Sequence, residues 1–323
     1  VDVSIPVTFE ISNAGSNNFI LHLLFVDQAS TSQVAVFPSA NGIVTYSYNL
    51  TVSQQIGSYR FVITEENSAV ELAYSDIFMV RANPFAGGIG TPIDPFQVSN
   101  AEQLSAVRDY MSSHFIQIAD IDLGVSPWTD GEGWTPIGTN TYKFTGKYDG
   151  KGFTISNIKI NRPTLAGVGL FGWASGATIS NVKIENVDIF GQQRIGALIG
   201  SMHNNGIITK CSSSGVTQGG NFTSGLVGNL YYGSSLSESF SSCTVIVNGV
   251  FQQAGGLVGR ILTSHVQNCY ATGSVTCSYW AGGLIGNATD NSTIANCYST
   301  GKVEGQVSFG GLVGGLTATT VTN

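Results

Sequence analysis

Apolar residues recur through the second half of the chain in short tracts that polar turn residues separate. The clearest tract is a small residue, two large apolar residues and a glycine, as in Gly256-Leu257-Val258-Gly259. Its six copies begin at positions 169, 197, 225, 256, 283 and 311, so the steps are 28, 28, 31, 27 and 28 residues. A fixed period of this size is typical of a repeat protein whose repeats stack on one another.

Two further tracts follow the first in each repeat. One has the form I-x-N, as in Ile294-Ala295-Asn296, and the other the form G-x-V, as in Gly273-Ser274-Val275. Three short strands per repeat predict one coil of a right-handed parallel β-helix, with Leu and Val in the interior and glycines at tight corners. At about 4.8 Å per coil, six to seven coils form a rod of roughly 30 Å.

Two places depart from this pattern. Ser239 and Phe240 stand where other copies have the Asn and Cys of the second tract, and this coil is longer, so we expect a bulged loop there. The sequence also stops inside an I-x-N tract, at Asn323, which leaves the edge of the last coil unpaired. We therefore expect the chain to be an internal or N-terminal part of a longer protein.

Residues 1–82 have a different pattern, in which turn residues separate six apolar stretches. The predicted strands are 3–12, 18–27, 33–38, 42–51, 57–66 and 69–81. Their spacing predicts an antiparallel sandwich. The segment around Tyr59 resembles the tyrosine corner of immunoglobulin-like domains, with Phe61 where antibody domains have their second cysteine. Residues 83–95 are rich in Gly and Pro and are predicted to be a linker.

One helix is predicted between the linker and the repeats. Ser99 and Glu102 have the spacing of a capping box. Apolar residues at i, i+3 and i+7 then mark one helix face: Leu104, Val107 and Met111. A helix over about 97–112 would cap the first coil, whose open edge would otherwise pair with other chains. The predicted second domain is thus 96–323.

Composition fits a turn-rich β protein and excludes some function classes. Only 10% of residues are charged, while 42% are hydrophobic and 41 are glycine. A net charge of −7 without a basic stripe argues against a nucleic-acid partner. No apolar run approaches the roughly 18 residues that a membrane span needs.

The repeats and the segment before them resemble the GLUG-motif family. The resemblance rests on six tandem G-L-V-G copies, on Trp134-Thr135-Pro136-Ile137-Gly138, and on residues 144–157 (FTGKYDGKGFTISN). It covers about residues 95–323. It implies a bacterial extracellular or cell-surface protein, often adhesin-like, and some family members are attached to surface peptidases. The family defines no catalytic residues that could be carried over.

The remaining chemical motifs predict no cofactor and no metal site. Residues 167–172 match G-x-G-x-x-G, but a β tract follows where a dinucleotide site needs a helix. The four histidines are scattered, and no G-x-S-x-G elbow favours a hydrolase. Several carboxylates near the first coils could hold calcium, yet they lack the spacing of a calcium motif and suit solvated turns equally: Asp120, Asp122, Asp130, Glu132 and Asp149.

The five cysteines all lie in the repeats and have no C-x-x-C spacing. Cys211, Cys269 and Cys297 each follow the I-x-N tract, so they belong to one column. We expect Cys269 and Cys297, on adjacent coils, to be buried, reduced and inaccessible to thiol reagents rather than joined in a disulfide.

A second column, three residues before each G-L-V-G tract, is the candidate ligand-binding site. It consists of Arg194, Phe222, Gln253 and Trp280. The next residue in the chain is small or apolar and is expected to face inward, so alternation turns this column outward. Exposed rings beside planar polar groups suit stacking on sugars or anchoring a protein partner. Single exposed aromatic residues are also ordinary on protein surfaces.

These observations predict an all-β, two-domain protein without catalytic activity, adhesin-like or displaying a ligand-binding face on a bacterial cell surface. The expected partner is a host or bacterial surface glycan or protein, not nucleic acid. We expect attachment to the membrane through an anchor outside this chain, and a monomer or part of a longer chain. Two alternatives remain open: a carbohydrate-binding accessory module of a larger surface peptidase or glycan-degrading enzyme, and a polysaccharide lyase-like β-helix enzyme.

Overall fold

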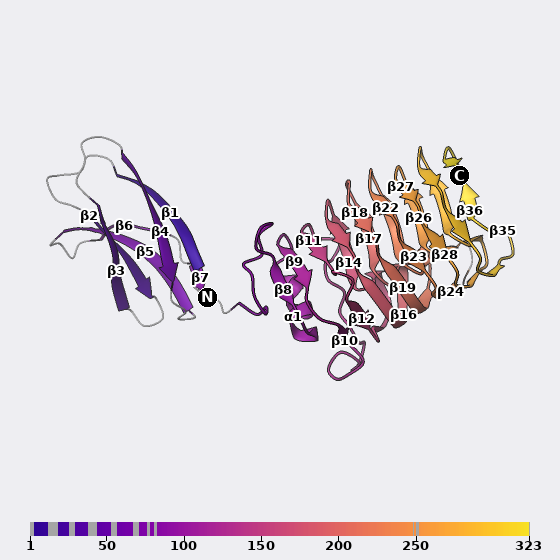
Figure 1. Ribbon diagram of the computed structural model, residues 1–323, viewed down its shortest axis with the longest axis horizontal. Coiled ribbons are helices and arrows are strands. Elements are labelled where there is room, and N and C mark those ends of the chain that lie inside the picture. The colour runs from indigo at the N-terminus through magenta and orange to yellow at the C-terminus, as the bar shows by residue number, and fades with distance from the viewer. Residues whose placement is uncertain are drawn as a thin grey trace. The chain divides into compact units, whose positions relative to one another are not determined.

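The computed structural model describes residues 3–11, 19–25, 30–37, 44–52, 57–66, 71–75, 78–80, 83–247, 249 and 252–322 (Figure 1). The chain divides into two compact units, Val1–Asn83 and Pro84–Asn323. Among the described residues, no helix is both long and apolar enough to cross a membrane.

The first unit consists of antiparallel strands. One pair is β1 (Val3–Ile11) with β4 (Val44–Val52). The other sheet has the order β3 (Ser30–Phe37), β2 (Phe19–Phe25), β5 (Gly57–Glu65), β6 (Glu71–Tyr74), with β7 (Phe78–Val80) also beside β5. The stretch predicted as one strand at 69–81 is therefore two strands. Tyr59 and Phe61 are buried on β5, while the predicted turns and Ile56 lie outside the described residues. The immunoglobulin-like assignment of this unit stays a prediction.

The second unit is a parallel β-solenoid of about six turns from residue 147 on, as the repeat period predicted. Three sheets run along it, and we number them in the order in which each coil visits them. Sheet 1 contains β8 (Phe96–Val98), β9 (His114–Gln117), β11 (Lys147–Asp149), β15 (Thr178–Ser180), β18 (Ile207–Thr209), β22 (Ser235–Ser237), β27 (His265–Gln267), β32 (Thr293–Ala295) and β37 (Thr320–Thr322).

In sheet 2, several coils contribute more than one strand, whereas the sequence predicted a single strand per coil. It contains β10 (Ile121–Asp122), β12 (Thr154–Ser156), β13 (Lys159–Val168), β16 (Lys183–Ile195), β19 (Ser212–Gly219), β20 (Thr223–Ser224), β23 (Phe240–Ser241), β24 (Thr244–Val247), β25 (Gln253–Gly255), β28 (Tyr270–Ala271), β29 (Val275–Cys277), β30 (Trp280–Gly282), β33 (Tyr298–Ser299), β34 (Val303–Glu304) and β35 (Ser308–Gly310). Sheet 3 contains β14 (Phe171–Ser175), β17 (Ile199–His203), β21 (Val227–Tyr231), β26 (Val258–Leu262), β31 (Ile285–Thr289) and β36 (Val313–Leu316).

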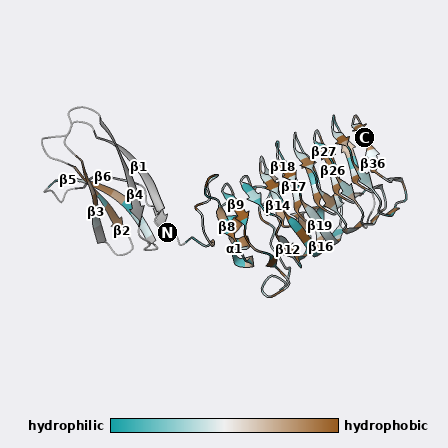
Figure 2. Cartoon of the chain, viewed as in Figure 1, coloured by the Kyte–Doolittle hydropathy of each residue, from teal (hydrophilic) through white to brown (hydrophobic). Residues whose placement is uncertain are grey.

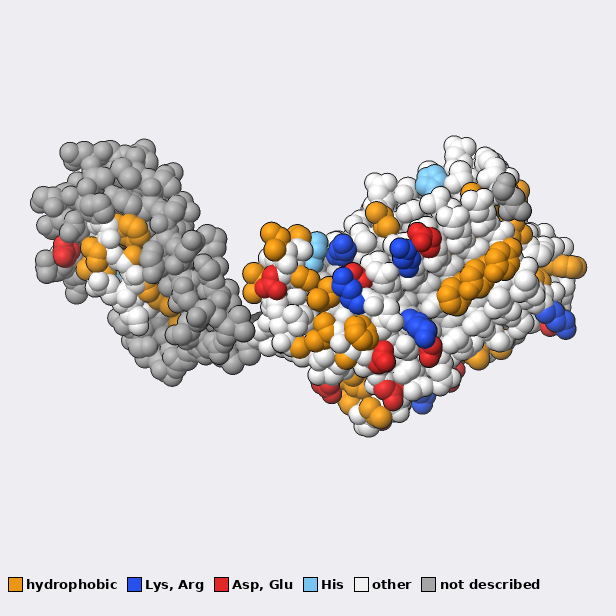
Figure 3. Space-filling view, in the orientation of Figure 1, with side chains coloured by type: hydrophobic (Ala, Val, Ile, Leu, Met, Phe, Trp, Pro, Cys, Tyr) orange, Lys and Arg blue, Asp and Glu red, His pale blue; other side chains and the backbone are white. Residues whose placement is uncertain are grey.

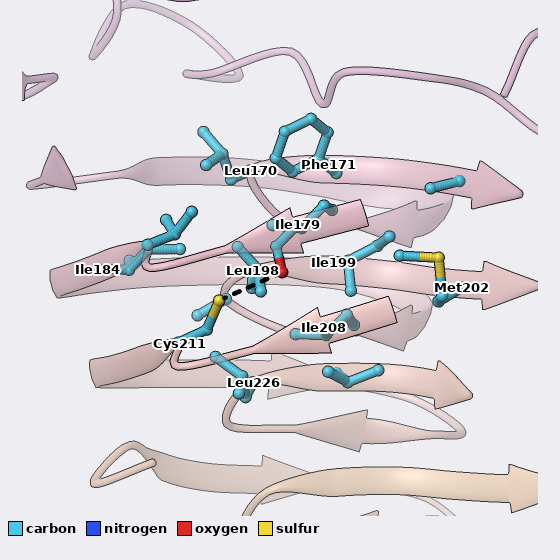
Figure 4. Close-up of a cluster of buried hydrophobic side chains, with 14 of the residues drawn as sticks. Leu170, Phe171, Ile179, Ile184, Leu198, Ile199, Met202, Ile208, Cys211 and Leu226 are labelled. Carbon is cyan, nitrogen blue, oxygen red and sulfur yellow. Dashed lines mark hydrogen bonds between the residues drawn. The ribbon is translucent and has the colours of Figure 1, made fainter. Parts of the chain in front are cut away.

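The interior is filled by the large residues of the G-L-V-G tracts, as predicted. Leu226 and Val227 are fully buried, and so are Leu257 and Val258 one coil further. Figure 4 shows the same arrangement around Leu198 and other interior side chains, and Figure 2 shows hydrophobic segments recurring from coil to coil.

The glycine that ends each tract is required by close approach of two backbones. A Cβ at Gly259 would lie 2.6 Å from the carbonyl oxygen of Gly228 and 2.7 Å from the carbonyl carbon of Phe222. Gly228 in turn lies against the backbone of Arg194. No side chain fits there, so the glycine recurs in every coil.

The Asn of each I-x-N tract forms a corner between sheets 1 and 2. Residues at this position have left-handed backbone φ angles of 48–54°: Asn181, Lys210, Glu238, Asn268 and Asn296. Asn tolerates this conformation better than most residues. Because Leu236 pairs with Ile208 and with Val266, Glu238 and Ser239 occupy the Asn and Cys positions of this coil.

The prediction that Ser239 and Phe240 occupy the Asn and Cys positions was therefore wrong by one residue. The prediction of a bulged loop around Phe240 was also wrong, because Phe240 and Ser241 pair regularly with both neighbouring coils. Five residues separate Val247 from Gln253, whereas two separate their partners Cys277 and Trp280. The extra length of this coil lies between β24 and β25.

A helical segment leads into the solenoid. It consists of α1 (Ala101–Ala106) and the 3-10 turn η2 (Val107–Asp109), and it buries Leu104 and Val107 as predicted. The N-cap is Asn100 rather than Ser99, because the Asn100 side chain accepts the backbone N–H of Gln103 at 2.9 Å. Asn100 and Gln103 also have capping-box spacing, and the Gln103 side chain accepts the Ser99 N–H.

Residues 84–95, expected to be linker, are instead bound to the second unit. Phe85 stacks on Phe96 with ring centres 4.4 Å apart and belongs to the solenoid core. The Ala86 N–H donates to Gln97 O, and the His114 N–H donates to Gly90 O. Gly and Pro determine the turns of this segment, but its one large aromatic side chain attaches it to the core.

The cysteines are free and buried, and the predicted interior column of Cys211, Cys269 and Cys297 is confirmed. Burial raises the pKa of Cys211 to about 12. A hydrogen bond between the thiols of Cys269 and Cys297 lowers the pKa of Cys297 to about 7 and raises that of Cys269. Their resistance to thiol reagents stays a prediction.

Candidate ligand-binding site

The four predicted site residues do form one column, at the turn from sheet 2 to sheet 3. Ile195 pairs with Thr223, and Thr223 pairs with Ala254. The residues that precede these three are therefore neighbours on adjacent coils: Arg194, Phe222 and Gln253. Gln253 in turn pairs with Trp280 on the next coil.

The backbone of this column is unusual. Arg194 and Phe222 have φ angles of 55° and 62°, a left-handed conformation that costs energy for residues with large side chains. The equivalent residue of the preceding coil, paired through Val168 and Ile195, is Gly167, with φ of 78°. The turn itself sets this conformation, and the Arg and Phe side chains occupy it where glycine would be the least strained residue.

Exposure differs from the prediction at one position. Arg194, Gln253 and Trp280 are partly exposed, but the Phe222 side chain is only 7% exposed. The guanidinium of Arg194 lies 5.9 Å from the centre of the Phe222 ring, and that of Arg260 lies 5.6 Å from it. The expectation of an exposed Phe222 was wrong because two arginines cover the ring.

Further aromatic residues extend this arrangement onto sheet 3. Arg194 also lies 5.5 Å from the Trp173 ring, and Arg260 lies 5.6 Å from the Tyr231 ring. His203 stacks on Trp173 at 5.7 Å and meets Tyr231 edge-on at 5.3 Å. We call these six residues the arginine–aromatic cluster: Trp173, Arg194, His203, Phe222, Tyr231 and Arg260.

A buried polar layer fixes the cluster from below. The side chains of Ser201 and Asn229 lie on the outer face of sheet 3 but are fully buried. The Ser201 hydroxyl forms a hydrogen bond of 2.8 Å with His203 Nε2. With its amide oxygen turned toward Tyr231 and Arg194, Asn229 accepts the Tyr231 hydroxyl at 3.1 Å and Arg194 Nε at 3.0 Å. The opposite amide orientation would satisfy neither. The side chains above are therefore held in fixed positions.

The cluster carries positive charge without a compensating acid. Among the described residues, the ion pairs of the solenoid involve other basic groups, and none involves Arg194 or Arg260. Burial, with Lys143 and Arg194 nearby, lowers the pKa of His203 to about 4. His203 is therefore neutral at pH 7.

The acidic residues near the first coils bond to protein groups of their own turns and of neighbouring coils. Asp122 accepts hydrogen bonds from the Gly124 N–H and the Asn157 amide. Asp149 likewise accepts from the Asn181 amide and pairs with Lys151. Within the described part of the chain, no three His, Cys, Asp or Glu residues lie close enough together to hold a metal ion.

A second aromatic row lies on sheet 2. The rings of Phe240, Tyr270 and Tyr298 are stacked nearly parallel, with centres 4.8 and 5.0 Å apart. Hydrophobic side chains form such a stripe across successive coils in Figure 3. Tyr298 is 53% exposed, and among the described residues no arginine lies over these three rings.

Sequence reasoning found the column but missed Trp173, His203, Tyr231 and Arg260. A signal for them exists: after the second glycine of each tract, polar or aromatic residues alternate with the buried Ala174, Met202, Leu230 and Ile261. That period of two places them on the outer face of sheet 3.

Comparison with known proteins supports the repeat assignment. The family model of the GLUG motif matches residues 252–276 and 280–304, which supports a GLUG-repeat β-helix. Halomucin of Haloquadratum walsbyi is 33% identical over 208 residues, which are 61% of this chain and 2% of halomucin. A "Putative Gly-rich membrane protein" of Evansella cellulosilytica is 38% identical over 101 residues, 31% of this chain and 12% of that protein.

The chain thus spans only a small part of these curated relatives. The fold is also similar to the crystal structure of a "putative immunoglobulin A1 protease" from Bacteroides ovatus. That structure has a TM-score of 0.61 and 24% identity, over 73% of this chain and 78% of the other.

Proposed function

We propose that this protein is a non-catalytic, adhesin-like module of a cell surface, which binds a surface glycan through the arginine–aromatic cluster and the adjoining Trp280. The observation that carries the proposal is the alignment of Arg194, Phe222, Gln253 and Trp280 on adjacent coils. Within this column, Arg194 and Phe222 also contact side chains of sheet 3. The names of the two relatives, a halomucin and a Gly-rich membrane protein, support a place at the cell surface.

The geometry suits a saccharide. Strands of neighbouring coils lie about 4.8 Å apart, so a ligand along the solenoid axis meets one side chain of the column per coil. The Trp280 indole is partly exposed, and an indole ring presents an apolar face with a polar group at its edge, which fits the face and hydroxyls of a sugar. The rings of Trp173, Phe222 and Tyr231 are only 7–9% exposed, and they contact the guanidinium groups of Arg194 and Arg260. Buried Ser201 and Asn229 hold the rings in place before any ligand binds, which reduces the entropy lost on binding.

The residues around the cluster also support a binding role over a lyase-like reaction. In the described structure Arg194 and Arg260 form no ion pair with a carboxylate, so the clustered acids that we expected of a lyase-like site do not pair with these arginines. An accessory module of a larger surface enzyme would use the same site and is the second candidate.

The test is binding of the full chain to a glycan array. We expect Trp280→Ala to abolish the binding found for the wild type and to leave the melting temperature nearly unchanged, because Trp280 is partly exposed. Tyr298→Ala is the matched control, since Tyr298 is an exposed ring that stacks on Tyr270 instead. Unchanged binding by Trp280→Ala would contradict the proposed site. Release of unsaturated uronate from any bound glycan would show lyase activity instead.

A further inference from the structure

We infer that the ligand is an acidic saccharide, whose carboxylate or sulfate group is bound between Arg194 and Arg260. This inference rests on the proposed function and names the chemical class of its ligand. Four features of the cluster carry it.

The first feature is the pairing of two cations on one ring. Arg194 and Arg260 lie 5.9 and 5.6 Å from the centre of the same Phe222 ring. Each gains from the ring's electron-rich face, while their like charges repel each other. Within the described chain no carboxylate neutralises either one, so an external anion is the missing partner.

The second feature is the hydrogen-bonding capacity left on the two guanidiniums. Arg194 uses Nε to bond Asn229, which leaves both of its terminal nitrogens for a ligand. Arg260 donates one terminal nitrogen to the Tyr231 hydroxyl at 3.4 Å, while its Nε is buried without a partner. Planar guanidinium edges of this kind bind carboxylate and sulfate oxygens in pairs.

The third feature is the local potential. Lys143 and Arg194 both act, after burial, to lower the pKa of His203. Positive charge thus extends across the cluster from Lys143 to Arg260, in a chain whose net charge is −7. A local positive field of this kind attracts anionic ligands selectively.

The fourth feature distinguishes a saccharide from a free anion. Phosphate or sulfate alone would need only the two arginines, but a partly exposed amide and a partly exposed ring continue along the same column at Gln253 and Trp280.

The experiment measures binding of the full chain to three hexasaccharide probes by calorimetry. The probes are hexagalacturonate, which carries carboxylates, a heparin-derived hexasaccharide, which carries sulfates, and neutral maltohexaose. We expect one of the acidic probes to bind and maltohexaose not to bind. Binding of hexagalacturonate would show that a carboxylate suffices. Binding of the heparin-derived probe alone, which carries carboxylates as well as sulfates, would show that sulfate is required.

Variants locate the binding to the cluster. Arg260→Gln and Arg194→Gln should each weaken binding of the acidic probe about tenfold or more, while Arg260→Lys, which keeps the charge but loses the planar edge, should restore only part of it. Lys302→Gln controls for simple loss of one positive charge, since exposed Lys302 pairs with Glu304. Melting temperatures of the variants check that each one is folded.

Two results would overturn the inference. One is that neither acidic probe binds, or that maltohexaose binds as well as they do. The other is that both glutamine variants bind the acidic probe like the wild type. In either case the proposed function survives if Trp280→Ala still abolishes binding on the glycan array, so the two proposals can fail separately.

Discussion

Gly259 shows at the residue scale why a chemically inert tract recurs. A Cβ at this position would lie within 2.8 Å of backbone atoms of Gly228 and Phe222, and neither backbone can move without separating two coils. We predict that Gly259→Ala lowers the free energy of unfolding by roughly 1–3 kcal/mol, as overpacking of an interior does. Urea denaturation followed by circular dichroism measures this loss.

The matched control is Gly311→Ala. Gly311 begins a G-L-V-G tract, but a Cβ there would meet no atom within 4 Å, so the midpoint should stay close to that of the wild type. Equal losses for the two variants would contradict the role of close packing at Gly259, because the effect of Gly→Ala on the unfolded chain alone is stabilising.

His203 predicts a dependence of stability on pH. Burial, with Lys143 and Arg194, lowers its pKa from 6.5 to about 4 in the folded protein. The unfolded chain therefore binds a proton more readily, and the contribution of His203, fully present above pH 6.5, is lost as pH falls toward 4. Because the ring is partly exposed, the loss is about 1 kcal/mol and not the full shift.

Unfolding free energies of the wild type and His203→Phe, measured between pH 7.5 and pH 4.5, test this. Phe keeps a ring against Trp173 but cannot bind a proton, so the variant should lose less stability on acidification than the wild type. His265→Phe, at an exposed position of sheet 1, should follow the wild type. Parallel curves for wild type and His203→Phe would refute the role of His203.

At the scale of elements, the helix before the solenoid depends on its cap. Asn100 accepts the Gln103 N–H, whereas the Ser99 hydroxyl only donates to the Gln103 side chain. We predict that Asn100→Ala costs about 1 kcal/mol in unfolding free energy and that Ser99→Ala costs clearly less. Chemical denaturation of both variants provides the measurement. If Ser99→Ala destabilised the protein more than Asn100→Ala, Ser99 would be the N-cap, as the sequence predicted.

The elements that the sequence could predict are those marked by hydrophobic period. The spacing of the G-L-V-G tracts predicts the coil, and Leu226 and Val227 are interior as expected. The corners are harder to predict, because Glu238 takes the same left-handed conformation as Asn296 without resembling it chemically. Ser99 and Asn100 are likewise both good caps, so residue type cannot choose between them.

The candidate site was predictable in position but not in packing. A common offset from each tract places Arg194, Phe222 and Trp280 in one column. The burial of Phe222 depends on Arg260, which lies on sheet 3 and nearly 40 residues later in the chain. The spacing within one column cannot predict which side chains of another sheet will cover it.

At the scale of the whole molecule, the boundary between the two units determines which segment can fold alone. The unit that begins at Pro84 includes Phe85, which is buried against Phe96, Tyr110 and Phe115 with ring centres 4.4–5.5 Å apart. Backbone hydrogen bonds join Ala86 and Gly87 to Gln97. The segment 84–95 is therefore part of the folded solenoid and not a spacer.

We predict that a fragment of residues 84–323 folds with the cooperativity and midpoint of the solenoid transition in the full chain. A fragment of residues 96–323 should be less stable by about 3 kcal/mol, since it loses the buried Phe85 ring and leaves the Gln97 backbone groups unpaired. Urea unfolding of both fragments and of full-length Phe85→Ala measures this, and the point variant should reproduce most of the loss. If the two fragments unfold at the same midpoint, residues 84–95 are a linker after all, as the Gly- and Pro-rich sequence predicted.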